Sequence, residues 1–245
     1  VAIPTGMVLY GPPGCGRAFL ARHYADEVGL SCMFITPATL KSRYVNATQE
    51  NIAKMFKEAE EKAPTVIFID EMNELVPNRD GGDVHEMSKS AVNEMLAQMD
   101  RTGEKGVFII GATNYPNMID PAILRAGRLD KKYYIGVPDA EARAALFKLY
   151  LEKRPYDFGL DYQLLADMTK NYVSADIQLI VNDASRQALK QHCKITMNIL
   201  ESTIKNTLPS LSVSELNKYE RIRAMMNGET ASKTKERSRI GFNAK

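Results

Sequence analysis

The sequence predicts an α/β protein in which an open, mostly parallel five-stranded sheet, flanked by helices, precedes a small all-helical domain. Three observations lead to this fold class. Short apolar runs alternate with helical periodicity over the first 137 residues, and no strand candidate follows residue 138. The first apolar run also passes through a glycine-rich turn directly into a helix. Such an alternation is typical of sheets whose functional site lies at the carboxyl edge of the strands.

Five short apolar runs are the strand candidates: residues 7–10, 32–36, 65–69, 106–112 and 133–137. The run at 65–69 is apolar and rich in β-branched residues, as expected of a central strand buried on both faces. Helical periodicity covers residues 17–28, 50–62 and 88–99 between these runs. Gly29 is expected to end the first helix in the left-handed conformation that glycine accepts.

Beyond residue 138 the periodicity is helical only. Asp139 is expected to cap a helix that extends to about residue 153, and Ser212 or Ser214 to cap one that reaches Met226. Between them, helices are expected over residues 161–168 and 174–192. We therefore predict a large α/β domain over residues 1–137, a small helical domain over 138–229 and a basic, disordered tail over 230–245. A docking arm is the alternative interpretation of the tail.

The glycine-rich turn has the features of a phosphate-binding loop. Its glycines let several backbone N–H groups point at one anion, and the following helix N-terminus adds partial positive charge. The pattern G-x-x-x-x-G-K-[ST] is met at both glycines, but Arg17 replaces the lysine and Ala18 replaces the hydroxyl residue that ligates Mg²⁺. An ordinary strand-to-helix turn is the alternative. The predicted site consists of Gly11, Pro12, Pro13, Gly14, Cys15, Gly16, Arg17, Ala18 and Phe19.

Asp70 and Glu71 follow the strand at 65–69, and Asn114 follows the next strand along the chain. A carboxylate at this edge can hold Mg²⁺, and its neighbour can polarise the water that attacks a γ-phosphate. The Asn114 amide could orient that water. Each residue alone is an ordinary surface group at a strand end, but a phosphate loop upstream favours a nucleotide site.

These motifs, in this order, make the sequence resemble the AAA module of the ring-forming ATPases, which include katanin, spastin and the proteasomal ATPases. The matching segments are residues 11–14 of the first phosphate motif (Walker A), residues 66–71 of the second (Walker B), residues 111–114 of the sensor and residues 119–130 of the arginine-finger segment. The similarity extends from about residue 5 to residue 228. It implies the phosphate-loop NTPase fold, with ATP or ADP and Mg²⁺ as ligands.

The resemblance implies a role for each matching residue. Asp70 would serve the metal, Glu71 would be the catalytic base and Asn114 would sense the γ-phosphate. Arg125 and Arg128 would project into the nucleotide site of the neighbouring subunit, where an arginine can raise turnover by about 10³–10⁵. A pair of surface charges is the alternative for these two arginines.

Tyr44 stands where the family places an aromatic residue on a loop that lines the central pore and grips extended polypeptide. A surface tyrosine is the alternative, and Asn46 replaces the glycine that is usual in this loop. The helical domain would be the lid, because residues 172–176 resemble its signature.

The sequence departs from the family pattern at three positions near the phosphate site. Arg17 keeps the charge of lysine on a longer, planar group, and Ala18 removes a metal ligand. Asn73 stands where the family often has a further acidic residue. The family segment that precedes the first strand and helps to hold adenine is absent, so we expect Val1 to be a truncation point. These departures bear on intrinsic turnover.

The composition fits a soluble globular protein, with 44% hydrophobic and 25% charged residues. A net charge of +2 favours neither nucleic acid nor a membrane as partner. Cys15, Cys32 and Cys193 are widely spaced and suggest neither a disulfide framework nor a metal site. The sequence contains no apolar stretch of 18 residues, and we expect no signal peptide. We expect an intracellular, cytoplasmic protein.

We therefore expect an AAA ATPase module that binds ATP at subunit interfaces of a homo- or hetero-oligomeric ring, most simply a hexamer. It would couple ATP binding and hydrolysis to remodelling or unfolding of a protein partner. The alternative is a hydrolysis-deficient subunit that binds nucleotide and supplies arginine fingers to an active partner. A nucleic-acid remodeller is disfavoured by the near-neutral charge and the lack of a recognisable DNA-binding module.

Overall fold

A computed structural model describes residues 5–43, 48–79 and 86–228 of the chain. The chain divides into two compact units, Val1–Gly136 and Val137–Lys245. Among the described residues, no helix has the length and apolar character needed to cross a bilayer.

The first unit contains a five-stranded parallel sheet in the order β2-β3-β4-β1-β5. Its strands are β1 (Gly6–Tyr10), β2 (Ser31–Ile35), β3 (Thr65–Ile69), β4 (Val107–Thr113) and β5 (Lys131–Tyr134). The predicted fold class is confirmed, and the predicted bounds of β3 are those observed. The last strand was expected over 133–137 but begins two residues earlier and ends at Tyr134.

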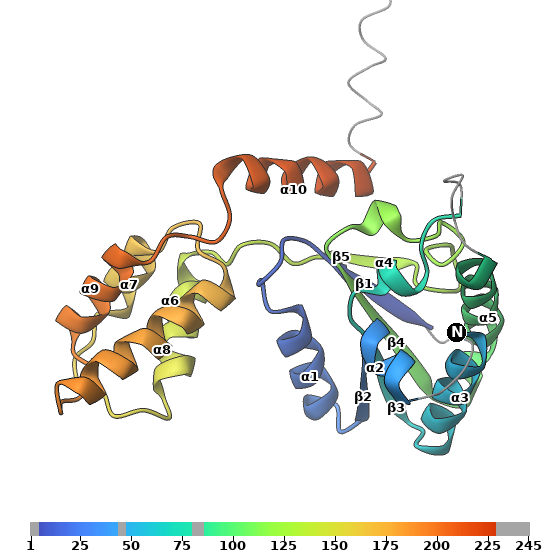
Figure 1. The fold of residues 1–245 in the computed structure, drawn as a ribbon, viewed down its shortest axis with the longest axis horizontal. Helices are drawn as coiled ribbons and strands as arrows, with labels where there is room; N and C mark the ends of the chain where they lie inside the picture. The colour runs from blue at the N-terminus through green and yellow to red at the C-terminus, as the bar shows by residue number, and fades with distance from the viewer. Residues whose placement is uncertain (1–4, 44–47, 80–85, 229–245) are drawn as a thin grey trace, which may run out of the picture. The chain divides into compact units, whose positions relative to one another are not determined.

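Helices cover both faces of this sheet because its central strands are apolar on both faces, as the five buried residues of β3 show. On one face, Leu9, Phe68 and Ile110 pack with Ala21 and Ala25. These alanines belong to α1 (Arg17–Glu27), which lies on the opposite side of the sheet from α3 (Thr48–Glu61) and α5 (Glu86–Thr102) (Figure 1).

Three short elements lie close to the carboxyl edge of the sheet: α2 (Pro37–Arg43), α4 (Met72–Leu75) and the 3₁₀ turn η2 (Pro116–Met118). A second 3₁₀ turn, η1 (Gly103–Lys105), connects α5 to β4. Helix α2 was not predicted. Pro37 was expected only to stop β2, but proline is also well accommodated in the first turn of a helix because no helical hydrogen bond needs its N–H.

Strand register brings the ends of three strands to one place. Tyr10 of β1 pairs with Thr113 of β4, and Ile69 of β3 pairs with Gly111. The residues that follow, Gly11, Asp70 and Asn114, therefore leave the sheet at the same edge. This is the crevice in which open α/β sheets bind ligands.

The second unit is helical in its described part, as predicted. It consists of α6 (Ala140–Leu151), α7 (Tyr162–Met168), α8 (Ser174–Lys190), α9 (Met197–Asn206) and α10 (Val213–Met226). The side chains of Asp139 and Ser212 cap α6 and α10, as predicted, and the side chain of Asp161 caps α7. Helix α9 was not predicted, although Thr196 caps it.

The predicted lid signature fixes one end of α8. The buried Asp176 carboxylate accepts hydrogen bonds from the backbone N–H groups of Val173 (3.0 Å) and Ser210 (3.2 Å). Tyr172 donates its hydroxyl to the carbonyl oxygen of Thr207 at 2.6 Å. The segment thus connects α8 to the chain between α9 and α10.

Two predictions lie outside the described residues. They are the pore tyrosine, Tyr44, with Val45 and Asn46, and the basic tail over 230–245.

Candidate functional site

The loop between β1 and α1 depends on glycine. Gly11, Gly14 and Gly16 have φ angles of +148°, +76° and +90°. A Cβ atom on Gly11 would lie 2.2 Å from the carbonyl oxygen of Ile135, so the strand and the loop can approach only because this side chain is missing. The conformation of this loop therefore depends on glycine at these positions.

The N-terminus of α1 is available to an anion. Gly16 is its N-cap residue, so no side chain accepts hydrogen bonds from the first N–H groups, and the first turn contains no acidic residue. Such a helix end combines unsatisfied N–H donors with the positive end of the helix dipole. Phe19 lies farther along this helix, where its ring packs on the His23 ring at a centroid distance of 3.8 Å.

Arg17 hydrogen-bonds both to the backbone of the loop and to the residue that follows β4. Its Nη1 donates to the carbonyl oxygens of Gly11 (2.8 Å) and Pro12 (2.7 Å). Its Nη2 donates to the amide oxygen of Asn114, 97 residues farther along the chain. The guanidinium thus connects the phosphate loop to the end of β4, and all three of these acceptors are neutral oxygen atoms.

The two carboxylates after β3 differ in their backbone conformation. Asp70 extends the strand, since its N–H donates to the carbonyl oxygen of Ile35 at 2.8 Å, and its Oδ1 accepts the N–H of Glu71 at 3.0 Å. Glu71 has φ +51° and ψ +42°, the left-handed region that residues with a side chain rarely adopt. This conformation turns the chain into α4 and leaves the Glu71 side chain exposed. Strained residues of this kind concentrate at functional sites.

Asn114 lies beside a second polar pair. Thr113 is buried, and its hydroxyl donates to the amide oxygen of Asn73 at 2.6 Å while accepting the N–H of Tyr115 at 2.9 Å. Asn73 therefore fixes the end of β4 to α4. In the sequence, Asn73 was notable only because it replaces an acidic residue that is frequent in the family. The structure shows that Thr113 is its hydrogen-bond partner.

The residues at this edge fit Mg²⁺ only in part. Asp70 supplies one carboxylate, Ala18 supplies no hydroxyl, and no group of three acidic, histidine or cysteine side chains within the described ranges is arranged to hold a metal. Mg²⁺ usually retains water and phosphate oxygens among its ligands and takes only one or two carboxylates from the protein. The donor set is adequate for a metal held jointly with a polyphosphate.

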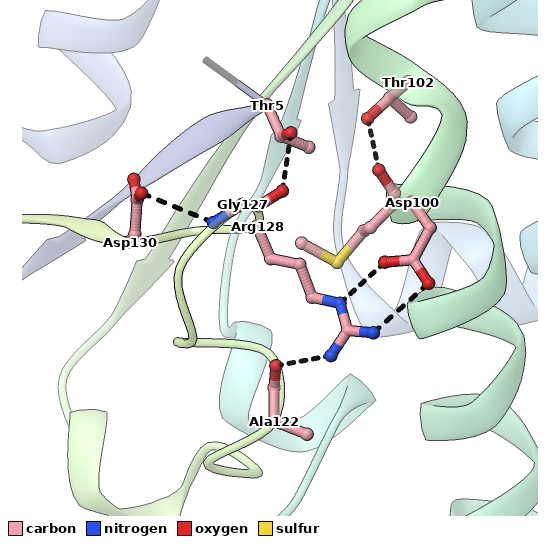
Figure 2. A network of polar contacts seen from close by, with 8 residues as sticks. Thr5, Asp100, Thr102, Ala122, Gly127, Arg128 and Asp130 are labelled. Carbon is pink, nitrogen blue, oxygen red and sulfur yellow. Dashed lines mark hydrogen bonds and ion pairs between the residues drawn. The ribbon is translucent and has the colours of Figure 1, made fainter. Parts of the chain in front are cut away.

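The two candidate finger arginines lie on one loop, residues 120–130, but in different surroundings; Figure 2 shows those of Arg128. Arg125 is exposed. Arg128 makes a two-point ion pair with Asp100 of α5, with Nε–Oδ1 at 2.8 Å and Nη2–Oδ2 at 3.2 Å. Its Nη1 donates to the carbonyl oxygen of Ala122 at 3.0 Å. The hydrogen bond from Arg128 is the main cause that lowers the pKa of the Asp100 carboxyl.

Two residues of this region escaped the sequence analysis. Asp100 has no spacing relation to Arg128 that a motif could encode. The only indication in the sequence is that Asp100 lies in the last turn of a helix, where the helix dipole destabilises a negative charge. Asp120, which is buried, pairs with Arg79 at an Nε–Oδ2 distance of 2.6 Å. A buried acidic residue needs a partner, but the sequence did not indicate which one.

Comparison with known proteins places this arrangement in a family. Residues 7–137, from β1 through the end of β5, match the family described as "ATPase family associated with various cellular activities (AAA)". The cell division cycle protein 48 homolog of Archaeoglobus fulgidus is 35% identical over 237 residues, which cover 89% of this chain and 32% of the relative.

Two further relatives give the same result. The protein SAV of Sulfolobus acidocaldarius is 34% identical over 230 residues (85% of this chain, 29% of the relative). The ATPase family gene 2 protein of Saccharomyces cerevisiae is 33% identical over 240 residues (94% and 30%). The chain spans about a third of the length of these curated relatives. The match over more than half of its residues shows that the chain belongs to the AAA family of ATPases.

Proposed function

We propose that this chain is an ATP-binding AAA module that acts within an oligomeric ring and couples its nucleotide state to the remodelling of a protein partner. The observation that carries the proposal is the convergence at one sheet edge of the glycine-rich loop after β1, the Asp70–Glu71 pair and the Asn114 amide. Family membership supports ATP-driven activity in general.

Nucleotide binding would draw mainly on the backbone. The N–H groups of the loop and of the uncapped α1 N-terminus present donors to the phosphates without any rearrangement of side chains. Arg17 would exchange its present carbonyl and amide acceptors for phosphate oxygens. A guanidinium gains from that exchange, because its hydrogen bonds to a charged oxygen are stronger than those to a neutral one.

Hydrolysis would depend on the carboxylates. Glu71 is the proposed base, exposed beside the loop, and Asp70 is the proposed metal ligand. Mg²⁺, when bound with the nucleotide, would neutralise phosphate charge. Asn114 would orient an attacking water through its amide group, whose oxygen accepts a hydrogen bond from Arg17 in this structure.

A second candidate is favoured by that last contact. Arg17 occupies the Asn114 oxygen, and Ala18 offers no metal ligand, so this subunit would bind nucleotide with little turnover of its own. It would then act by lending an arginine of the 120–130 loop to a neighbouring active site. Both candidates require nucleotide binding and a ring, and they differ only in turnover.

Steady-state ATP turnover by the full-length protein separates the two candidates. An active module should lose at least about 10²-fold in rate with Glu71→Gln, because general-base assistance typically contributes 10²–10⁴. The matched control is Glu74→Gln, an exposed carboxylate on α4 close to Glu71 in sequence, which should leave the rate unchanged. A rate that is already negligible and insensitive to Glu71→Gln, with nucleotide still bound, would favour the second candidate.

The remodelling part of the proposal depends on residues 44–46. If Tyr44 contacts a polypeptide in the ring, Tyr44→Ala should abolish substrate-stimulated turnover while basal nucleotide binding persists. Equal stimulation of the variant by unfolded protein would contradict a pore role for this tyrosine.

A further inference from the structure

Glu71, the proposed catalytic base, has a backbone conformation that its surroundings must maintain. Its φ of +51° and ψ of +42° lie in the left-handed region, which a residue with a side chain adopts only at a cost in free energy. The Glu71 side chain is exposed, so its own packing does not hold the turn in place. The restraint must therefore come from the residues on either side.

The residue before Glu71 is fixed by the sheet, but the helix after it is short. Asp70 continues β3, and its Oδ1 accepts the Glu71 N–H at 3.0 Å. On the other side, α4 has only four residues. Its hydrogen bonds run from the Glu74 N–H to the Glu71 carbonyl oxygen (2.9 Å) and from the Val76 N–H to the Met72 carbonyl oxygen (3.0 Å). Because a single helical turn is not stable by itself in water, tertiary contacts must hold α4.

Two neighbouring residues of α4 contact one face of β4. Met72 is fully buried, and its sulfur lies against bare backbone, since a Cβ atom on Gly111 would be 2.3 Å from it. The next residue, Asn73, accepts the Thr113 hydroxyl through its amide oxygen at 2.6 Å. Gly111 and Thr113 are two positions apart in β4, so both face the same side of the sheet. The packing contact keeps α4 close to the strand, and the hydrogen bond fixes its orientation.

Both hydrogen-bonding functions of the Thr113 hydroxyl are used in this arrangement. Thr113 is 1% exposed, its hydroxyl oxygen accepts the N–H of Tyr115 at 2.9 Å, and its single hydrogen is donated to Asn73. Position 73 must therefore supply an acceptor. A carboxylate would accept the same hydrogen, but it would add a negative charge two positions from Glu71 and three from Asp70. The asparagine keeps the hydrogen bond and avoids that repulsion.

We infer that Asn73 and Thr113 form a positioning pair, which holds the left-handed turn at Glu71 and thereby fixes this carboxylate relative to Asn114. The inference rests on the proposed function, because it takes Glu71 as the base and Asn114 as the residue that orients the water. Thr113 directly precedes Asn114, so its hydroxyl connects the two segments that carry these side chains. Neither member of the pair is assigned a contact with the nucleotide.

The first test measures kcat for ATP and the dissociation constant of ADP separately, in the full-length protein. Thr113→Val keeps the shape of the side chain but removes the hydroxyl, and Asn73→Ala removes the acceptor. Each should lower kcat about tenfold or more and leave the ADP affinity unchanged, because a small displacement of a catalytic group is costly for the reaction but not for binding to the loop. Thr113→Ser retains the hydroxyl and should keep kcat within about twofold of the parent.

The matched control is Thr102→Val, at the end of α5. Thr102 is also fully buried, and its hydroxyl donates to the carbonyl oxygen of Met99 at 2.9 Å. Its loss removes a comparable hydrogen bond from the same unit without touching α4, so kcat should not change. If Thr102→Val lowers kcat as much as Thr113→Val, or if Thr113→Val lowers kcat and ADP affinity by the same factor, the pair is only structural and the inference is wrong.

The second test needs no turnover. Amide hydrogen exchange in the ligand-free protein reports the opening of α4 through the N–H groups of Glu74 and Val76. Their exchange should become about fivefold faster or more in Thr113→Val and in Asn73→Ala, the effect of one lost hydrogen bond, and should keep the parent rate in Thr113→Ser. Unchanged exchange in the first two variants would overturn the inference.

A failure of the proposed function gives a different result. A parent protein without ATP turnover, or with turnover that does not respond to Glu71→Gln, would contradict the role of Glu71 as the base. Hydrogen exchange would then decide alone whether the pair holds the turn: faster exchange at Glu74 and Val76 supports it, and unaltered exchange contradicts it.

Discussion

Arg17 and Arg128 are both held by oxygen atoms of their own unit, but the oxygens differ in charge. Arg17 donates to two carbonyls and one amide, all neutral, at the mouth of the anion loop. Arg128 donates to a carboxylate and one carbonyl. A polyphosphate outcompetes neutral acceptors for a guanidinium more readily than it outcompetes a carboxylate, because ionised acceptors form the stronger hydrogen bonds. A phosphate would therefore displace these three acceptors of Arg17 more readily than it would displace the Asp100 carboxylate from Arg128.

For these two charged residues, the position in the family motif and the contacts in the structure lead to different interpretations. The family pattern marks Arg17 as a departure and Arg128 as a match, whereas the contacts suggest that Arg17 can still serve phosphate and that Arg128 serves the loop. The predictions below test whether the phosphate loop and the 120–130 loop differ in this way.

The largest effect is expected from glycine substitutions that compare the two loops directly. Gly11→Ala places a Cβ atom 2.2 Å from the Ile135 carbonyl oxygen at φ +148°, so it should destabilise the protein by about 3 kcal/mol or more and abolish nucleotide binding. Gly127 has φ +84°, but no described atom beyond its chain neighbours lies within 4 Å of the place that a Cβ atom would take. Gly127→Ala should therefore cost only about 1–2 kcal/mol of backbone strain. Chemical denaturation measures the free energy of unfolding of both variants. Equal losses of stability would contradict the expected difference between the two loops.

The next effect concerns turnover at the phosphate loop. Arg17→Lys with Ala18→Thr should free the Asn114 oxygen and add a hydroxyl for the metal, and we expect turnover to rise by about 10²–10³. Each single substitution is a control, because only the pair supplies both features. Steady-state ATPase rates test this prediction. An unchanged rate in the double variant would show that residues 17 and 18 do not limit turnover.

The smallest effect is a pH dependence at the 120–130 loop. Arg128 lowers the pKa of Asp100 mainly through its hydrogen bond, so the folded state favours the ionised carboxyl. The stabilisation is therefore complete above the ordinary carboxyl pKa of about 3.9 and is lost as the pH falls through the lowered value. Because Asp100 is partly exposed, Asp100→Asn should destabilise the protein by no more than about 1 kcal/mol at pH 7.

The same difference in stability should shrink as the pH falls below the ordinary carboxyl range, and it should vanish once the Asp100 carboxyl is protonated in the folded protein as well, because the parent and the Asp100→Asn protein then both have an uncharged group at this position. Denaturation midpoints across this range provide the measurement. A constant difference at all pH values would show that Arg128 does not depend on the charge of Asp100.

Much of the fold followed from local pattern. The run at 65–69 could be placed as a buried central strand because all five residues are apolar or β-branched, and β3 has those bounds. The bounds predicted for the edge strand β5 were wrong because Lys131 and Lys132 are polar and exposed. The apolar residues that indicate a strand begin only after them. The position of β5 is determined by its backbone hydrogen bonds to β1, and these cannot be predicted from hydropathy.

The candidate site was predictable where chemistry is local and not where it depends on distant partners. Spacing within the chain identified the loop at 11–18, the Asp70–Glu71 pair and Asn114. It could not show that Arg17 reaches Asn114, that Thr113 reaches Asn73, or that Asp100 holds Arg128. These contacts join residues separated by 28 to 97 positions, and only the packing of the sheet and its helices brings them together.

The most direct test of the account is a calorimetric titration of the full-length protein with ADP, using the parent protein and Arg17→Ala. We predict that the parent binds and that Arg17→Ala binds at least about tenfold more weakly, because hydrogen bonds to charged phosphate oxygens are lost. Arg22→Ala is the matched control, an arginine of the same helix whose guanidinium lies over the Phe34 ring, and its affinity should equal that of the parent. No binding by the parent at millimolar ADP, or equal affinity of the parent and Arg17→Ala, would contradict the claim that this arginine exchanges its neutral partners for phosphate.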